Sequence, residues 1–321
     1  MKTFAFKIFI VLGFTLLIQL SVGFFTYRVE RHSCLQLEVS EPSNSYYVYL
    51  GDSTNRSVSK SDIDKRAIST MIEDGIKQQV VTVSNGGQQL KLHKEYVEHF
   101  LGLNKKPDVI IIPINMRLFS VQTDTNPMYE RKKETLLLRY GFLGNALYKP
   151  LSVYTNYFND VTSKNAWLNS DVYDFDKYSG KVNEFENESY KTSSPAKMIK
   201  KVTYFYRFNL KKESANLKAL NDICSLAKEQ KQRVLFYITP IDVEYLDKIY
   251  SGTAGLITKN IATIKKVTSS YGMPLIDLSH TIGSRDFNWQ VDIYPNEHMN
   301  ERGRLFVAGS LLNELKKMTQ E

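Results

Sequence analysis

Residues 46–57, YYVYLGDSTNRS, decide how the rest of the chain is interpreted. Their aromatic and β-branched side chains predict a buried strand that ends at Gly51-Asp52-Ser53-Thr54. A glycine permits a sharp turn, and a serine beyond it would lie at the carboxyl end of the strand, where open α/β sheets bind ligands. Ser53 is therefore a candidate nucleophile, although a strand-ending turn with a helix cap explains the same four residues.

The composition and charge fit a folded chain with one main domain. The 321 residues carry a net charge of +8, and the many lysines are interspersed with acidic residues. Nucleic-acid-binding domains usually concentrate positive charge on one face, so this distribution argues against a nucleic-acid partner. It fits an anionic surface or polymer better, and nothing in the composition indicates disorder or a fibrous repeat.

The chain has only two cysteines, Cys34 and Cys224, and neither lies in a CxxC motif or a Cys/His cluster. The sequence therefore predicts neither a structural zinc site nor a disulfide framework, and no motif indicates another metal or a cofactor. A single bridge between the two cysteines stays open as an alternative.

An uncharged apolar run occupies residues 8–27, close to the N-terminus. About twenty such residues are the length that a helix needs to cross the hydrocarbon core of a membrane. We therefore expect residues 1–28 to form a membrane-spanning signal-anchor, with the domain of residues 29–321 on the extracytoplasmic side, periplasmic or at the cell surface. A signal peptide cleaved near residues 21–23 competes with this interpretation, and a buried core helix is a third.

Strands and helices alternate after Ser53. Apolar spacing predicts a helix over 68–76, a strand over 80–83 and a helix over 90–103. The strand over 80–83 runs into Gly86 and Gly87, which form either a turn able to present backbone N–H groups or a plain glycine loop. The run VIIIPI from residue 109 predicts a central parallel strand, and Asn115 follows its end.

The pattern changes from about residue 120 to 212, where we find no clean strand period and predict an insertion. Regular order resumes with a helix from residue 213, a strand over 233–239, a helix near 255–270 and a strand over 273–278. Five strands separated by helices predict a doubly wound, three-layer α/β/α fold of the flavodoxin-like type.

Residues 292–303, DIYPNEHMNERG, precede a final amphipathic helix and supply acids and a histidine from a loop after the fifth strand. Such a loop can fold over the sheet edge that carries Ser53, so that His298 acts as general base on the hydroxyl. A lone loop histidine is otherwise ordinary surface decoration. Here a candidate nucleophile and two further strand-end turns favour the catalytic interpretation.

In this order the motifs resemble those of the SGNH (GDSL-like) hydrolase superfamily: GDST, the glycine turn, PDVIIIPIN and EHMNERGR. The likeness covers about residues 30–119 and 213–321 and leaves the insertion out. It implies the SGNH hydrolase fold and an attack by Ser53 on an ester carbonyl. It also implies an oxyanion hole formed by the N–H of Ser53, the N–H of Gly86 or Gly87, and the side chain of Asn115.

The chain departs from the superfamily at the acid that orients the histidine. The superfamily usually has an aspartate three residues before the histidine, but this chain has Pro295 there. Asp292 is the favoured orienting acid, Glu297 is the second candidate, and a Ser53–His298 dyad is the third. Pro113 also replaces the glycine of the third motif.

The anchor and the serine site together predict a membrane-anchored serine esterase or O-acyltransferase, with acetyl as the favoured acyl group. The expected substrate is an acylated cell-envelope or secreted polysaccharide, or a small ester, and the expected partners are the membrane and a membrane acyl-transfer protein. The alternative is a catalytically weak or inactive SGNH-fold subunit that binds or assembles with a surface-polymer modification complex.

Overall fold

The computed structural model describes residues 2–34, 45–84, 86–124, 135, 138–140, 182–185, 194–288 and 297–320. The chain forms two compact units. The first comprises Met1–Glu41 and Glu130–Phe175, and the second comprises Pro42–Tyr129 and Asp176–Glu321.

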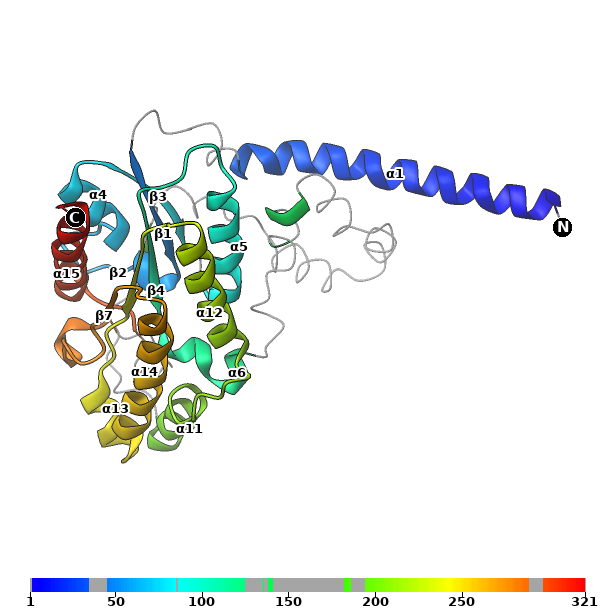
Figure 1. Ribbon diagram of the computed structural model, residues 1–321. Coiled ribbons are helices and arrows are strands. Elements are labelled where there is room, and N and C mark those ends of the chain that lie inside the picture. The colour runs from blue at the N-terminus through cyan, green and yellow to red at the C-terminus, as the bar shows by residue number, and fades with distance from the viewer. Residues whose placement is uncertain are drawn as a thin grey trace. The chain divides into compact units, whose positions relative to one another are not determined.

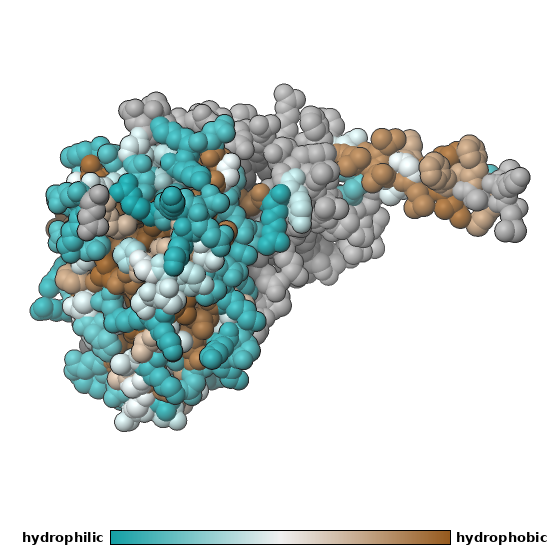
Figure 2. Space-filling view, viewed as in Figure 1, coloured by the Kyte–Doolittle hydropathy of each residue, from teal (hydrophilic) through white to brown (hydrophobic). Residues whose placement is uncertain are grey.

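The first unit contains helix α1, Lys2–Cys34, which covers residues 2–28 of the predicted membrane anchor and continues past it. Its described large apolar side chains, from Phe4 to Ile18, are exposed and form the brown surface of this helix in Figure 2. Within the described residues, no helix combines the length and the apolarity required to cross a membrane. The predicted transmembrane anchor is therefore not supported.

The second unit is built on a five-stranded parallel sheet (Figure 1). The strand order is β3-β1-β4-β6-β7, so the chain first moves outward from β1 and then crosses back to its other side. This order confirms the predicted doubly wound α/β fold, with its switch point between β1 and β4. The strands are β1 (Tyr46–Gly51), β3 (Gln79–Ser84), β4 (Val109–Ile114), β6 (Val234–Ile238) and β7 (Leu275–Asp277).

Helices cover both faces of this sheet, which gives the three layers that the sequence predicts (Figure 1). One face carries α4 (Ile68–Ile76) and α15 (Glu301–Gln320). The other face carries α5 (Leu90–Leu101), α12 (Ala215–Glu229) and α14 (Thr253–Ser270). Strands β1, β4 and β6 are buried along their whole length, which their continuous apolar sequences predict.

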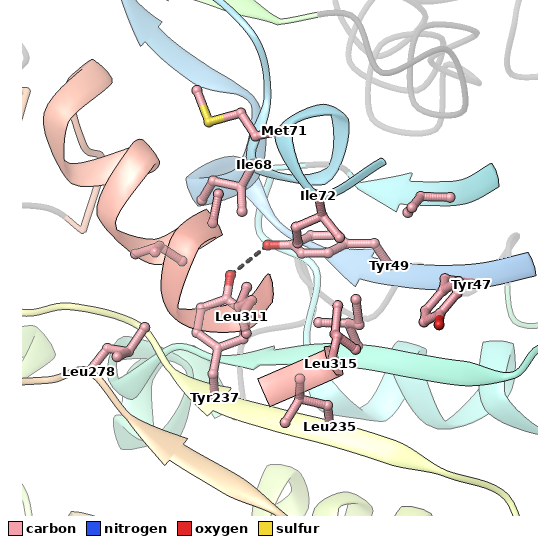
Figure 3. Packing of buried hydrophobic residues seen from close by; sticks show 14 of the residues in the cluster. Tyr47, Tyr49, Ile68, Met71, Ile72, Leu235, Tyr237, Leu278, Leu311 and Leu315 are labelled. Atoms are coloured by element: carbon pink, nitrogen blue, oxygen red, sulfur yellow. Dashed lines mark hydrogen bonds between the residues drawn. The ribbon is translucent and has the colours of Figure 1, made fainter. Parts of the chain in front are cut away.

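Two tyrosines meet in the core between the sheet and the α4–α15 layer (Figure 3). Tyr49 of β1 and Tyr237 of β6 point toward each other, and their hydroxyl oxygens lie 2.5 Å apart. Both side chains are fully buried, so each hydroxyl satisfies the other in an apolar environment. Burial is the main cause of the raised pKa of both phenols.

A second, two-stranded sheet connects the predicted insertion to the segment after Ser53. Strand β2, Ser57–Ser59, pairs in parallel with β5, Asn183–Phe185. The sequence predicts no strand in either place, because three residues are too few to show an alternating period. The remaining described elements are α3 (Ser53–Arg56), η1 (Met116–Phe119), α6 (Val121–Asp124), α11 (Pro195–Phe205), α13 (Val243–Ile249) and η5 (Ser284–Asp286).

Cys224 is a free, buried thiol on the inner face of α12. The side chain of Cys34, the partner that the sequence left open, lies outside the described residues. Burial raises the pKa of the Cys224 thiol to about 12, so this residue packs as an inert core side chain.

Candidate active site

Ser53 opens helix α3 directly after β1. Asp52 caps this helix, because its carboxylate accepts hydrogen bonds from the Thr54 N–H at 2.8 Å and from the Thr54 hydroxyl at 2.7 Å. Ser53 is half-buried, whereas Asp52 and Thr54 are buried. The capped turn thus presents the serine at the carboxyl edge of the sheet, the edge where the sequence predicts it.

Gly51 allows close packing at this turn. Its φ lies outside the left-handed region, so the conformational freedom expected from the sequence is not what requires glycine here. A Cβ atom at this position would lie 2.7 Å from Tyr49 Cε1 and 3.1 Å from Ser84 Oγ. A larger residue would therefore push against the buried Tyr49 ring and the Ser84 side chain.

His298 approaches Ser53 from the segment before α15. Its Nε2 lies 2.9 Å from Ser53 Oγ, although the two residues are 245 positions apart in the sequence. When Nδ1 carries the imidazole proton, Nε2 accepts the hydroxyl hydrogen of Ser53. This is the contact that a general base makes with a serine nucleophile.

Backbone and side-chain contacts hold the segment that carries His298. The Asn288 N–H donates to the His298 carbonyl at 2.8 Å, and the Asn288 side chain donates to the Met299 carbonyl at 2.8 Å. Arg304 of α15 also donates to the Met299 carbonyl, at 3.0 Å, and forms an ion pair with Asp62 at 2.8 Å. The loop after η5 and the first turn of α15 therefore position the imidazole.

The environment of His298 keeps its imidazole neutral. Burial is the main cause, and the charge of Arg117 adds to it; together they lower the pKa of His298 to about 3. A neutral imidazole can accept a proton from Ser53 throughout the neutral pH range. The imidazolium formed in that transfer would need compensation by a nearby negative charge.

The Asn115 side chain lies beyond β4, and both its amide nitrogen and its amide oxygen are hydrogen-bonded. Its Nδ2 donates to Asp52 Oδ2 at 3.2 Å, and its Oδ1 accepts from the Arg117 N–H at 3.0 Å and from Arg117 Nε at 3.3 Å. Asn115 is 1% exposed, so this orientation is fixed inside the protein. The contact with Asp52 brings the amide nitrogen beside the Ser53 turn.

Gly86 and Gly87 follow β3 at the same edge of the sheet. Gly51 and Ser84 are register partners in β1 and β3, so the turn after β3 begins beside the Ser53 turn. Gly87 has φ +71°, a left-handed conformation that favours glycine. The three strand ends that the sequence predicts to converge, those of β1, β3 and β4, therefore lie at one edge of the sheet.

Asp292 and Pro295 lie outside the described residues, so the favoured orienting acid stays a prediction. Glu297, the second candidate, is buried beside His298 in the chain, but its carboxylate is engaged elsewhere. It accepts hydrogen bonds from Thr239 Oγ1 at 2.5 Å and Tyr206 Oη at 3.2 Å, and it lies 3.5 Å from Arg117 Nε. Among the described residues, no hydrogen bond joins Glu297 to His298.

Burial is the main cause of the raised pKa of Glu297, which reaches about 7, although Arg117, Thr239 and Tyr206 act in the opposite direction. Sequence reasoning missed the roles of these three residues. Thr239 could have been found as a polar residue at the carboxyl end of β6. Arg117 follows Asn115 by two positions, and Tyr206 lies in the predicted insertion, where no local pattern marks it.

Within the described residues, no group of three or more His, Cys, Asp or Glu side chains could hold a metal ion.

No protein-family model matches the sequence, and a search of curated proteins finds no match. Among solved structures, the chain is similar to a lipase/acylhydrolase from Enterococcus faecalis, with 11% identity and a TM-score of 0.41 over 85% of this chain and 96% of that one. It is also similar to the acetylxylan esterase Axe2 from Geobacillus stearothermophilus, with 11% identity and a TM-score of 0.39 over 85% and 94%.

A third similar structure is the salicylyl-acyltransferase SsfX3 from a tetracycline biosynthetic pathway, with 11% identity and a TM-score of 0.41 over 87% of this chain and 56% of that one. At such identities and TM-scores the similarities assign no activity to this chain. The geometry of Ser53, His298 and Asn115 carries the functional proposal.

Proposed function

We propose that this protein is a serine-dependent ester hydrolase or O-acyltransferase. The observation that carries the proposal is the 2.9 Å contact between His298 Nε2 and Ser53 Oγ at the carboxyl edge of the sheet. The neighbouring Asn115 amide supports it, because an amide N–H beside a serine nucleophile can stabilise an oxyanion.

In the proposed reaction, Ser53 Oγ attacks the acyl carbonyl carbon while His298 Nε2 takes the hydroxyl proton. The carbonyl oxygen becomes an oxyanion, for which Asn115 Nδ2 is the side-chain donor. When the tetrahedral intermediate collapses, the carbon–oxygen bond to the alcohol breaks and the imidazolium returns the proton to the leaving alcohol. Water or an acceptor hydroxyl then attacks the acyl-serine by the same steps and releases the acid or the new ester.

The finer assignment is an acetyl group on a carbohydrate polymer of the cell envelope or a secreted polysaccharide. The sequence interpretation supports this assignment, and a substrate panel tests it. Release of acetate from acetylated polysaccharides, compared with longer acyl chains, would support it. Equal activity on acyl groups that are not attached to carbohydrate would contradict the polymer assignment. An extracytoplasmic location also stays a prediction, which protease accessibility in intact cells would test.

The direct test is covalent labelling of Ser53 by a fluorophosphonate, together with hydrolysis of a small aryl acetate. Ser53→Ala should abolish both, and His298→Ala should abolish hydrolysis. Ser270→Ala and His280→Ala are matched controls, because both side chains are exposed and neither residue belongs to the candidate site. Asn115→Ala should lower kcat by about a hundredfold or more, since it removes an oxyanion donor.

The alternative function, a subunit that binds or assembles without catalysis, predicts a different result. Such a protein would not be labelled at Ser53, and any residual hydrolysis would be equal in the wild type and in Ser53→Ala. That outcome would end the enzymatic proposal.

A further inference from the structure

Arg117 connects the two halves of the candidate active site. Its Nε lies 3.3 Å from Asn115 Oδ1, on the oxyanion side, and 3.5 Å from Glu297 Oε1, beside the general base. The Arg117 N–H donates to the same Asn115 oxygen at 3.0 Å. The guanidinium is mostly buried, with its side chain 14% exposed, so water screens these contacts weakly.

Glu297 is held by residues from separate elements. Thr239 follows the end of β6, and Tyr206 follows the end of α11. Their hydroxyls donate to opposite carboxylate oxygens, Oε2 and Oε1 respectively. Arg117 approaches Oε1 from η1. The two hydroxyls therefore hold the Glu297 carboxylate in one position beside Arg117.

The orientation of the Asn115 amide depends on Arg117. Only the amide oxygen can accept from the Arg117 N–H and Nε, so these donors direct the nitrogen toward Asp52. Nδ2 carries two hydrogens, and it makes no second hydrogen bond within the described part of the chain. The second hydrogen is the one available to an oxyanion at Ser53.

We propose that Glu297 is a positioning residue for the oxyanion hole: its carboxylate holds Arg117, and Arg117 fixes the Asn115 amide with the nitrogen on the Ser53 side. Protonation of Glu297 removes the charge that holds Arg117 and loosens this amide. The inference rests on the proposed function for its catalytic consequence, but the link from Glu297 to Asn115 exists without it.

Burial, modified by the surrounding groups, places the titration of Glu297 in the neutral range. Burial raises its pKa to about 7 and the Asp52 charge acts in the same direction, while Arg117 and the Thr239 and Tyr206 hydroxyls lower it. Tyr237 lies near this carboxyl, and its own pKa is raised, so it stays neutral there. His298 has a pKa of about 3 and does not titrate in the same range.

The first test follows the Asn115 side-chain amide by NMR in the full chain labelled with ¹⁵N-asparagine, with the signal assigned through Asn115→Ala. The Asn115 amide shifts should titrate with a midpoint near pH 7 in the wild type, and Glu297→Gln should remove this titration. Glu314→Gln is the control, because that carboxylate pairs with Lys317 on the surface of α15. A titration that persists unchanged in Glu297→Gln would overturn the proposal.

The second test is a double-mutant cycle on the rate of Ser53 phosphonylation by a fluorophosphonate. Glu297→Gln should lower this rate by about tenfold in the wild-type background, the effect of losing a hydrogen bond to a charged group. In the Asn115→Ala background it should lower the rate less than about twofold, because the group that it positions is gone. Independent effects that multiply in the double variant would overturn the proposal.

A second variant and the NMR titration distinguish a folding defect and a failure of the proposed function from a failure of this proposal. If Glu297→Gln does not fold, Arg117→Lys enters the same cycle, since it keeps the charge but removes the Nε donor. If the wild type does not react with the fluorophosphonate, the proposed function fails. The NMR titration still decides the link from Glu297 to Asn115 in that case.

Discussion

Two buried arginine–carboxylate pairs lie in the same domain, and they differ in the distance between the arginine and its carboxylate. Arg304 is completely buried and lies 2.8 Å from Asp62, and it also donates to the backbone carbonyls of Asp64, Arg66 and Met299. Its donors thus join the start of α15 to the segment after β2. This pair has the properties of a structural clamp.

The Arg117–Glu297 pair is looser. Its closest approach is 3.5 Å, and the same Nε also faces Asn115. A buried carboxylate with a distant, shared counter-charge is stabilised less in its ionised form, which agrees with its raised pKa of about 7. The close Arg304–Asp62 pair thus holds the segment that carries His298, whereas the longer Arg117–Glu297 contact leaves the oxyanion side sensitive to pH.

The largest expected effect is at the clamp. Arg304→Ala leaves Asp62 buried without its counter-charge and should lower the free energy of unfolding by about 3–5 kcal/mol, measured by urea denaturation. Arg66→Ala is the control, because the Arg66 side chain is 45% exposed and its ion pairs should be worth less than about 1 kcal/mol. Similar small losses in both variants would contradict the assignment of Arg304 as a clamp.

The next effect concerns the looser pair and depends on pH. Because the pKa of Glu297 is raised from 4.5 to about 7, the folded protein keeps a proton that the unfolded chain releases between these values. Stability contributed at this residue is therefore lost as pH rises through that window, by roughly 3 kcal/mol in total.

Urea denaturation at about pH 5 and about pH 8 gives the free energy of unfolding of Glu297→Gln and of the wild type. The change with pH in the difference between the two proteins measures this contribution. The variant should gain stability relative to the wild type as pH rises. His298 acts with the opposite sign, because its lowered pKa causes a loss of stability on acidification below 6.5, but it is present in both proteins and cancels. A difference that does not change with pH would show that Glu297 has an ordinary pKa.

The smallest effect tests how tightly the clamp region is packed, using two glycines of α15. A Cβ atom on Gly303 would lie 2.5 Å from the Asp286 carbonyl oxygen and 2.8 Å from Met299 Cβ, whereas one on Gly309 meets nothing within 4 Å. Gly303→Ala should cost about 1–3 kcal/mol of stability and move His298. Gly309→Ala should stabilise the helix by about 0.5–1 kcal/mol. In thermal denaturation, Gly303→Ala should therefore lower the Tm and Gly309→Ala should raise it.

Sequence reasoning predicted the sheet well because each of its main strands is a continuous apolar run. Residues 46–51, 109–114 and 234–238 are buried on both sides, and their order between helices indicates a doubly wound fold. The three-residue strands β2 and β5 were missed, since pairing between distant segments leaves no local period. At the N-terminus, the apolar run located the helix α1. The predicted membrane-crossing span is not supported within the described residues.

For the candidate site, sequence reasoning found the residues that end strands or precede helices. Ser53, Asn115 and His298 occupy such positions, and the structure brings Ser53 and His298 into contact. It did not find the link between Arg117 and Glu297, which are 180 positions apart, because an ion pair is defined by three-dimensional neighbours. The sequence suggested Glu297 only through its place beside His298, whereas its contacts lead to Arg117.

The Tyr49–Tyr237 hydroxyl pair has a consequence for the active edge as well as for the core. Strands β1 and β6 pair with opposite sides of β4, so the two phenols meet only when each of these strands has its correct offset along β4. A slip of either strand by one residue would turn its tyrosine to the opposite face of the sheet. Ser53 lies four residues beyond Tyr49, and Thr239 lies two beyond Tyr237. The hydroxyl pair therefore fixes where Ser53 and Thr239, the residue that binds Glu297, lie along the carboxyl edge of the sheet.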